Sequence, residues 1–385
     1  MGSVVMPMIT LILTQKIGFS KSEAGILATL VMLSQAPFIM MSGRLIDRIG
    51  SKKVIVIFNA LGAAAYLPCV FIKPHFMMAV FIAIAADMFS VASPAYNAIV
   101  TEVAPQNQIK SAFSIVYLGF NLGLTIGPAF AGILFNEHLH LLFLLDSITC
   151  ILSLVLFIRF VPDHSHVKKQ KLRAQQEKHP FDLKDPGNTF LLHSRVMIIF
   201  AVILLGYNFC YSQWGFMLPL QSTSFFKTSG PQFYSLLVIV NAFAVIILTP
   251  MLTIITHKLR PLRIIAFGGL FYAMSFFIFS GAKLLYAFVF ATIILTIGQI
   301  TININTNSFI AERTPPEYIG RANSLLTIIN GAGVAIGPVI MGQVLMQIDY
   351  HLAWISVAIL MLISAIGMFV LGRNRRQEKF VERLE

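Results

Sequence analysis

The chain has 385 residues, of which 57% are hydrophobic and 11% are charged, and its mean hydropathy is +0.80. Soluble globular proteins carry about 25% charged residues, so this composition excludes an ordinary soluble protein and predicts an integral membrane protein. The formal net charge is +12. Its basic residues cluster between apolar stretches, which favours contact with anionic lipid over nucleic-acid binding. The three cysteines have neither metal-site nor disulfide spacing, so we expect no metal site and no cofactor.

Twelve apolar segments follow one another along the chain, bounded by charged residues, Pro and Gly. They are residues 1–15, 20–41, 53–72, 76–103, 108–135, 139–161, 194–220, 230–256, 264–281, 284–311, 320–346 and 352–372. Most have the about 20 apolar residues that a spanning helix needs, and none alternates as β-barrel strands do. Ser20 and Glu23 are spaced as a capping box at the start of the second segment.

These segments predict an all-α membrane protein built from two pseudo-symmetric six-helix bundles, residues 1–161 and 194–372. A hydrophilic loop, residues 162–193, joins the bundles, and residues 373–385 form a tail. The first segment is short, because 14 residues make about 21 Å of helix against a hydrocarbon thickness of ~30 Å. It lacks the basic front end and cleavage site of a signal peptide, so we expect helix 1 to be truncated.

The distribution of basic residues predicts the orientation in the membrane. When the central loop is placed in the cytoplasm, 23 of the 28 Lys and Arg residues fall on the cytoplasmic side and 5 on the opposite side. We therefore expect a multi-pass protein of a bacterial plasma membrane, with the central loop and the C-terminus in the cytoplasm.

One ten-residue pattern occurs twice, 210 residues apart: GLTIGPAFAG at 123–132 and GVAIGPVIMG at 333–342. The flanks hold the same register, as Asn97 with Asn307 and Glu102 with Glu312 show, which indicates an internal duplication. Small residues at four-residue spacing let helices approach closely, and proline inside a helix produces a kink. We interpret these positions as hinges and seals between moving helices, although static packing is the alternative. The positions are Gly123, Gly127, Pro128, Gly132, Gly333, Gly337, Pro338 and Gly342.

Residues 43–53 read GRLIDRIGSKK and lie between the second and third segments. This stretch resembles the loop signature of the major facilitator superfamily, G-x-x-x-D-R-x-G-x-[KR]-[KR]. The Gly-Pro segment of helix 5 is similar to the antiporter motif of the superfamily's proton-driven drug exporters. The resemblance implies a fold of twelve helices, in which two halves rock about a central binding site. Those exporters often carry an arginine early in helix 4, which this chain lacks.

We interpret the signature as a conformational latch, a set of contacts that form only when the cytoplasmic side is closed. Asp47 is expected near the start of helix 11, at the positive end of its dipole, and Arg48 is expected to pair with Glu102. The alternative is a basic loop that only sets the topology. At the 210-residue offset the second half has His257 for Asp47, which predicts an asymmetric machine. The predicted latch residues are Gly43, Asp47, Arg48, Gly50, Lys52, Lys53 and Glu102.

Two carboxylates inside apolar segments are candidates for proton coupling. Asp87 lies about 17 Å along helix 4, near the middle of the membrane, and Asp146 lies six residues into helix 6. Ionisable groups at such depths are costly and are functional by default, and burial disfavours the charged form of a carboxyl group. The alternative is that either acid only forms hydrogen bonds across the bundle.

The second half offers neutral polar side chains in place of acids. Amides and aromatic rings around an apolar cavity suit amphipathic molecules or lipophilic cations, although they serve equally well as contacts between helices. The substrate-cavity candidates are Tyr207, Asn208, Tyr211, Trp214, Gln299 and Asn303.

The sequence therefore predicts a secondary transporter and no enzyme, since it has no HExxH or GxSxG motif and no P-loop for ATP. Proton-coupled export of drugs or similar amphipathic molecules is the favoured function. A nutrient importer working by proton symport and a non-transporting receptor of the same fold are the alternatives. The expected partners are a small-molecule substrate, protons and the lipid bilayer, and the protein is expected to be a monomer.

Overall fold

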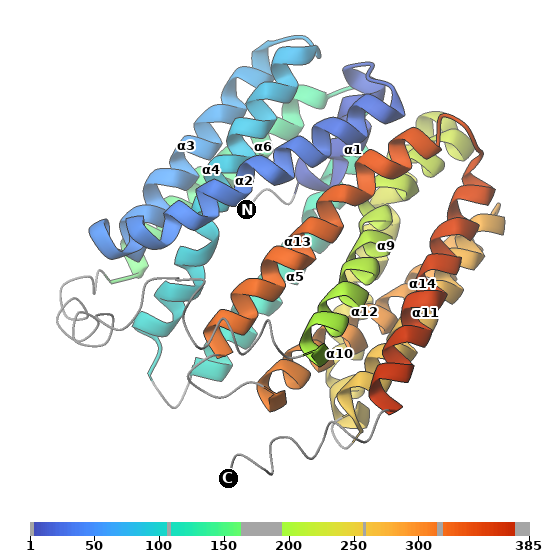
Figure 1. The fold of residues 1–385 in the computed structure, drawn as a ribbon. Helices are drawn as coiled ribbons and strands as arrows, with labels where there is room; N and C mark the ends of the chain where they lie inside the picture. Colours follow the sequence, from blue (N-terminus) through green and yellow to red (C-terminus); the bar gives the residue numbers. More distant parts are fainter. Residues whose placement is uncertain (1–3, 106–108, 163–194, 257–258, 314–318, 374–385) are drawn as a thin grey trace. The chain divides into compact units, whose positions relative to one another are not determined.

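A computed structural model describes the chain except for residues 1–3, 106–108, 163–194, 257–258, 314–318 and 374–385 (Figure 1). Nearly all of the predicted central loop and C-terminal tail therefore lies outside the described residues. Inside the helices, some side chains are also outside the description, namely those of Asp47, Asn307 and residues 101, 109–111, 113–114, 117–118, 195, 308, 311–313 and 319–329.

The described part of the chain consists of helices joined by short turns (Figure 1). The first half contains α2 (Lys21–Ile49), α3 (Ser51–Phe71), α4 (Phe76–Val103), α5 (Ile109–Leu134) and α6 (Leu139–Phe160). The second half contains α9 (Arg195–Phe226), η4 (Lys227–Ser229), α10 (Gly230–Thr256), α11 (Pro261–Gly281), α12 (Leu285–Arg313), α13 (Ile319–Val344) and α14 (Tyr350–Arg373). The bounds lie close to those of the predicted segments, with α2 and α9 extending further at their C-terminal ends.

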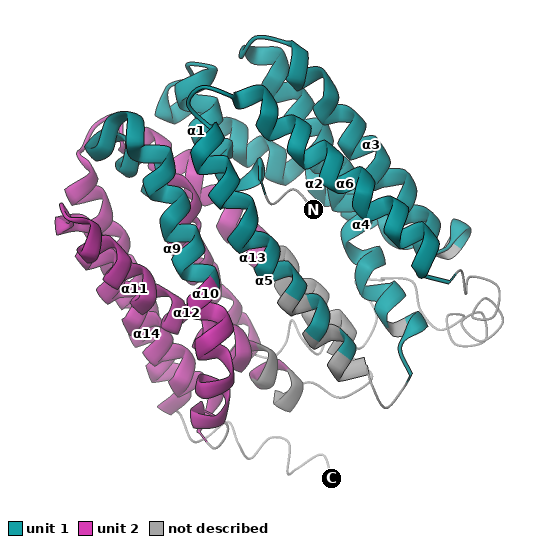
Figure 2. Ribbon diagram, turned by 180° about the vertical axis from the view of Figure 1, so that it is seen from behind, with its two compact units in different colours: residues 1–180, 218–242 teal, residues 181–217, 243–385 magenta. Residues whose placement is uncertain are grey.

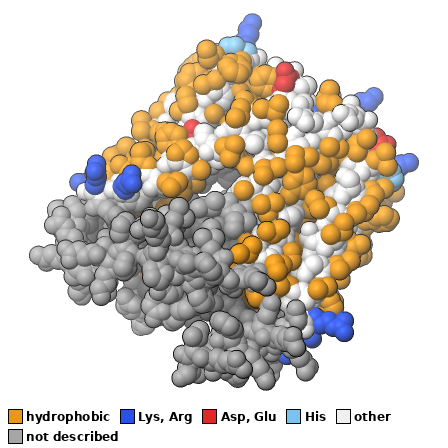
Figure 3. All heavy atoms as spheres, viewed as in Figure 1, with side chains coloured by type: hydrophobic (Ala, Val, Ile, Leu, Met, Phe, Trp, Pro, Cys, Tyr) orange, Lys and Arg blue, Asp and Glu red, His pale blue; other side chains and the backbone are white. Residues whose placement is uncertain are grey.

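The helices have the length and apolar composition of membrane spans. Eight described stretches qualify by these criteria, and one of them, Val196–Thr256, contains both α9 and α10. Large hydrophobic side chains are exposed along them, as Phe71 and Ile254 show. On the face drawn in Figure 3, hydrophobic side chains cover the described helices while Lys and Arg stand at helix ends. The all-helical membrane protein predicted from the composition is confirmed.

The first segment changes helix type twice instead of forming one regular helix. Met6–Met8 is a 3-10 turn (η1), Ile9–Leu11 is a turn of α-helix (α1), and Ile12–Lys16 is a π-helical turn (η2). Its apolar side chains are nevertheless inside, since Val5, Met8 and Leu11 are completely buried. The segment is therefore packed as part of its bundle.

The signature was expected in a loop, but most of it lies in the last turns of α2. α2 continues to Ile49, and Gly50 alone, with φ of 90°, separates it from α3. The helix continues because no proline stands between Ser42 and Ile49 and the single glycine there, Gly43, is tolerated inside a helix, whereas Gly50 adopts the positive φ that the sharp turn requires. At the other end of α2 the capping box is confirmed, since Ser20 and Glu23 exchange hydrogen bonds of 3.2 and 2.8 Å.

The chain divides into two compact units, coloured in Figure 2. Unit 1 contains residues 1–180 and 218–242, and unit 2 contains residues 181–217 and 243–385. The end of α9 and the start of α10 belong to unit 1 because they contact the end of α5. Asn136 donates a hydrogen bond to the carbonyl oxygen of Thr228, and Gly132 lies directly against Ser235 of α10. The bundle boundaries at 161 and 194 remain a prediction.

Each unit has its own aromatic core. In unit 1, α3 packs against α4 and α6, and the ring of Tyr66 lies 5.7 Å from Phe89 and 5.8 Å from Phe143. In unit 2, α11 packs against α12 and α14, and Trp354 lies 5.5 Å from the ring of Phe276. Aromatic contacts at these distances stabilise a core beyond area burial alone.

Candidate functional site

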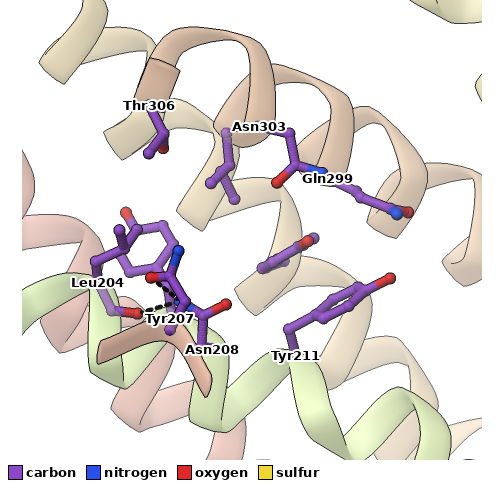
Figure 4. Close-up of a pocket in the computed structure, with 10 residues that line it drawn as sticks. Leu204, Tyr207, Asn208, Tyr211, Gln299, Asn303 and Thr306 are labelled. Atoms are coloured by element: carbon purple, nitrogen blue, oxygen red, sulfur yellow. Dashed lines mark hydrogen bonds between the residues drawn. The ribbon is translucent and has the colours of Figure 1, made fainter. Parts of the chain in front are cut away.

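A pocket of about 100 Å³ lies within unit 2 (Figure 4). Four helices contribute to its wall: α9, α11, α12 and α13. The lining residues are Leu204, Tyr207, Asn208, Tyr211, Tyr272, Gln299, Ile302, Asn303, Thr306 and Asn330. Most of these side chains are polar but uncharged, in contrast to the apolar helices that carry them.

Helix periodicity explains why α9 and α12 supply most of the wall. The lining positions on α9 are 204, 207, 208 and 211, and those on α12 are 299, 302, 303 and 306. Both sets follow the i, i+3, i+4, i+7 spacing that places side chains on one face of a helix. In Figure 4 the labelled side chains of the two helices face each other across the pocket. Two polar stripes therefore meet inside an otherwise apolar bundle.

Two asparagines join α9 to α13 at the edge of this pocket. The amide nitrogen of Asn208 donates to the carbonyl oxygen of Leu204 at 2.8 Å and to Oδ1 of Asn330 at 3.0 Å. Since the backbone carbonyl can only accept, the first bond fixes which end of the Asn208 amide is the nitrogen. The hydrogen bond between them holds one amide of α9 and one amide of α13 side by side in the pocket wall.

The tyrosines of the wall are held by close packing against glycines. The Tyr207 hydroxyl donates to the carbonyl oxygen of Ile265 at 3.2 Å, and a side chain at Gly269 would collide with this tyrosine. The rings of Tyr211 and Tyr272 are stacked with centroids 5.7 Å apart and an angle of 14° between their planes. A side chain at Gly298 would come within 2.8 Å of the Tyr272 ring. These rings are therefore rigid parts of the site.

Five of the six substrate-cavity candidates from the sequence line this pocket: Tyr207, Asn208, Tyr211, Gln299 and Asn303. Trp214 does not line it. Its side chain is 8% exposed and lies 6.4 Å from the ring of Phe279, in the aromatic core of unit 2.

Sequence reasoning missed three polar lining residues. Helix spacing could have identified Thr306, because it lies one turn beyond Ile302 and Asn303 on the polar stripe of α12. Tyr272 and Asn330 stand alone on α11 and α13, so no spacing pattern marks them. Their place in the wall depends on how those helices pack.

Asp87, the first proton-coupling candidate, joins α4 to α2 inside unit 1. Its side chain is half-buried, and its Oδ1 accepts a hydrogen bond of 2.9 Å from the hydroxyl of Ser34. One neutral hydrogen bond and partial exposure leave the carboxyl group reachable by water. Such a group can gain and lose a proton, which is the chemistry that coupling requires.

Asp146, the second candidate, has a different environment in the same unit. Its side chain is 3% exposed, and its Oδ2 accepts the backbone N–H of Val5 at 3.2 Å. It therefore attaches α6 to the chain just before η1. Both acids thus join two segments of unit 1, but Asp146 is more deeply buried and accepts from a backbone N–H, whereas Asp87 accepts from a hydroxyl.

The signature residues lie in unit 1, where α2, α4 and α6 end and α3 begins. The Lys52 ammonium donates to the carbonyl oxygens of Ile158, in the last turn of α6, and Val161, just after it, at 3.0 and 2.6 Å. The positive charge of Lys52 is also stabilised there by the negative end of the α6 dipole. The hydroxyl of Ser51 donates to Glu102 at 2.8 Å. The Asp47 side chain is outside the description, and the pairing of Arg48 with Glu102 remains a prediction.

The repeated glycines are packing positions in the parts that the structure describes. On α13, a side chain at Gly333 would come within 2.6 Å of the Leu205 carbonyl oxygen, and one at Gly337 would overlap the Ser212 hydroxyl of α9. On α5, Gly127 and Pro128 are buried, and Gly132 contacts α10. Close approach at these positions requires glycine. Their proposed role as hinges stays a prediction.

Among the described residues, no group of three or more His, Cys, Asp or Glu could hold a metal ion. The three cysteines are buried free thiols that lie on three different helices. The chemistry of the described site thus rests on neutral polar groups in unit 2 and two carboxylates in unit 1.

Comparison with known proteins was made for both sequence and fold. The family model of the Major Facilitator Superfamily matches residues 1–332 and 227–385. The uncharacterized MFS-type transporter YttB of Bacillus subtilis (strain 168) is 26% identical over 387 residues, covering 98% of this chain and 93% of the relative. A Na(+), Li(+), K(+)/H(+) antiporter of Planococcus maritimus is 22% identical over 348 residues, covering 83% of this chain and 81% of the relative.

Two solved structures show the same fold at low identity. The nucleoside transporter NupG superposes with a TM-score of 0.78 at 16% identity, covering 97% of this chain and 96% of the other. A POT family transporter superposes with a TM-score of 0.75 at 15% identity, covering 95% of this chain and 91% of the other. With the family match along the chain, these findings identify it as a multi-pass membrane protein of the Major Facilitator Superfamily, a secondary transporter and not an enzyme.

Proposed function

We propose that the protein is a proton-coupled exporter of drugs or similar amphipathic molecules that works by alternating access. The observation that carries this proposal is Asp87, a half-buried carboxyl group on the apolar helix α4 with a hydroxyl partner at 2.9 Å. A titratable group inside the apolar part of a membrane protein is energetically costly, so its presence indicates a function. Proton exchange is a function that a carboxyl group can perform. Substrate would bind to the uncharged polar pocket of unit 2.

A second candidate is exchange of monovalent cations for protons. It is favoured by the relative from Planococcus maritimus, whose name describes a Na(+), Li(+), K(+)/H(+) antiporter. Carboxylates are suitable oxygen ligands for hard cations, and Asp87 and Asp146 are the two acids within the apolar part of unit 1. The two candidates share the proton and differ in what is exchanged for it.

One assay separates the candidates. Everted vesicles with an acidic interior would be prepared, and the pH gradient followed with a fluorescent dye after addition of chloramphenicol, tetraphenylphosphonium, NaCl or KCl. The drug exporter predicts that an organic compound dissipates the gradient and that the salts do not. Dissipation by NaCl or KCl alone would establish the second candidate. No response to any addition in either vesicle orientation would contradict both and favour a receptor.

Asp87→Asn tests the proton carrier in the same assay. Asparagine keeps the size and the hydrogen bond to Ser34 but cannot titrate, so we expect gradient-driven flux to fall to background while substrate binding remains. Asp349→Asn is the matched control, because this exposed acid only caps the backbone N–H of Leu352. Full flux in Asp87→Asn would transfer the proton-carrier role to Asp146.

We also propose that the central loop and the C-terminus face the cytoplasm, on the strength of the basic residues in those segments. A cysteine introduced at Gln175 should react only with reagents on the cytoplasmic side. The three native cysteines are buried, so the background labelling is expected to be low. Labelling from outside in intact cells would reverse the orientation.

A further inference from the structure

The pocket of unit 2 contains a hydroxyl group whose lack of a partner needs an explanation. Three threonines of α12 donate to a carbonyl one turn back: Thr292 to Phe288, Thr296 to Thr292 and Thr301 to Ile297, each at 2.8 Å. Thr306 differs, since its hydroxyl has no hydrogen-bond partner among the described residues although the residue is buried, with only 8% of its surface exposed. Leaving a buried hydroxyl unpaired is unfavourable, so a bound molecule is expected to supply the partner.

The amide pair at the edge of the pocket has unused hydrogen-bonding groups. Both hydrogens of the Asn208 nitrogen are taken, one by Leu204 and one by Asn330. Within the described residues, the oxygen of Asn208 and the nitrogen of Asn330 have no hydrogen bond. An asparagine oxygen accepts and an asparagine nitrogen donates. The edge therefore presents an acceptor and a donor from two adjoining amides.

The aromatic part of the wall is flat and parallel. Tyr211 stacks on Tyr272 with 14° between the planes, and Tyr272 is held by the backbone at Gly298. A flat ring extends such a stack at a centroid distance of about 4.5–7 Å. A cation would instead favour several rings arranged around it, which a parallel pair does not provide.

The described lining carries no formal charge on any of its ten residues. A charged ligand would lose its hydration on entering and would meet no opposite charge in this wall, so its binding is strongly disfavoured. A neutral polar ligand exchanges water hydrogen bonds for those of the wall at little net cost. The lining therefore discriminates by charge as well as by shape.

We propose that this pocket binds uncharged, flat ring molecules that carry a hydrogen-bond donor and an acceptor on one edge. The edge pairs with Asn208 and Asn330, the ring stacks on Tyr211, and the acceptor oxygen of the ligand, which has two lone pairs, also accepts a hydrogen bond from the Thr306 hydroxyl. The proposal rests on the proposed function in one respect, because it takes the pocket to be the substrate site. It narrows the substrate class from amphipathic compounds in general to neutral cyclic amides and related heterocycles.

The test uses ligands that share one ring and differ in charge or edge. 2-Quinolone is a neutral flat amide, N-methyl-2-quinolone lacks the donor, N-methylquinolinium is a permanent cation, and quinoline-2-carboxylate is an anion. Binding to the purified full chain in nanodiscs would be measured by equilibrium dialysis without a pH gradient. We expect 2-quinolone to bind at least tenfold more tightly than the cation and the anion, and severalfold more tightly than its N-methyl derivative.

Matched variants test whether the ligand binds in this pocket. Thr306→Val should weaken 2-quinolone binding roughly 5- to 10-fold. Thr292→Val should leave binding unchanged, because Thr292 is on the same helix but outside the lining. Tyr211→Leu should weaken binding, whereas Tyr211→Phe keeps the ring and should preserve it. Equal effects of Thr306→Val and Thr292→Val would overturn the assignment of the site.

The outcomes separate this proposal from the proposed function. Tighter binding of N-methylquinolinium, or no binding of 2-quinolone, would overturn the neutral class and leave proton-coupled export standing. Selective binding of 2-quinolone with no response of the pH gradient to any addition, 2-quinolone included, would support the pocket while contradicting the exporter.

Discussion

The two units differ in the polar chemistry that their apolar helices carry. Unit 1 holds carboxylates, with Asp87 on α4 and Asp146 on α6. The described helices of unit 2 hold amides, hydroxyls and stacked tyrosines around a pocket. The 210-residue repeat relates the two halves, yet Asp87 corresponds to Ile297 and Gln299 corresponds to Phe89 at that offset. The repeat thus has the same glycines in both halves, while its polar positions differ, with carboxylates in one half and neutral polar groups in the other.

The largest expected effect is on the close contact between α13 and α9 in unit 2. Gly337→Leu should abolish transport, because a side chain there overlaps Ser212. Gly331→Leu is the matched control on the same helix, since nothing lies within 4 Å of a Cβ at this position. Transport would be measured beside surface expression. Normal flux in Gly337→Leu would show that the repeated glycine is not needed for the cycle.

The comparison between the two acids of unit 1 is sharpened by two changes at Asp146. Asp146→Asn keeps an acceptor for the Val5 N–H and should retain most of the gradient-driven flux. Asp146→Leu leaves that N–H unpaired in a buried place and should destabilise the protein by about 1–3 kcal/mol, which a lower melting temperature would report. Loss of flux in Asp146→Asn with normal stability would make it a second proton carrier.

The smallest expected effect concerns the signature, which only the first half retains. The latch predicted from the signature implies that Asp47→Asn removes a charge–helix contact worth up to ~1 kcal/mol, which should shift the protein toward its cytoplasm-open state by up to about fivefold. The labelling rate of a cysteine placed at Asn303 would measure this shift, with Asp349→Asn as the control. An unchanged rate would favour a basic segment that only sets the topology.

The sequence by itself determined the membrane class, the helix segments and most of one pocket face. Hydropathy is summed over about 20 neighbouring residues, and the Ser20–Glu23 capping box is formed within one turn. The i, i+3, i+4, i+7 rule placed Tyr207 and Asn208 on one stripe of α9, and Gln299 and Asn303 on one stripe of α12. Such local signals need no knowledge of neighbouring helices.

Only the tertiary structure decided which groups meet. Tyr272 joined the pocket while Trp214 joined the aromatic core, although both are aromatic residues in apolar helices. Asp146 bonds to the Val5 N–H, and Lys52 bonds to carbonyl oxygens at the C-terminal end of α6, across long sequence separations. The physical reason is that an apolar helix can present any of its faces to a neighbour. Its rotation and contacts are chosen by packing of many side chains and by glycine positions where backbones approach, which hydropathy does not encode.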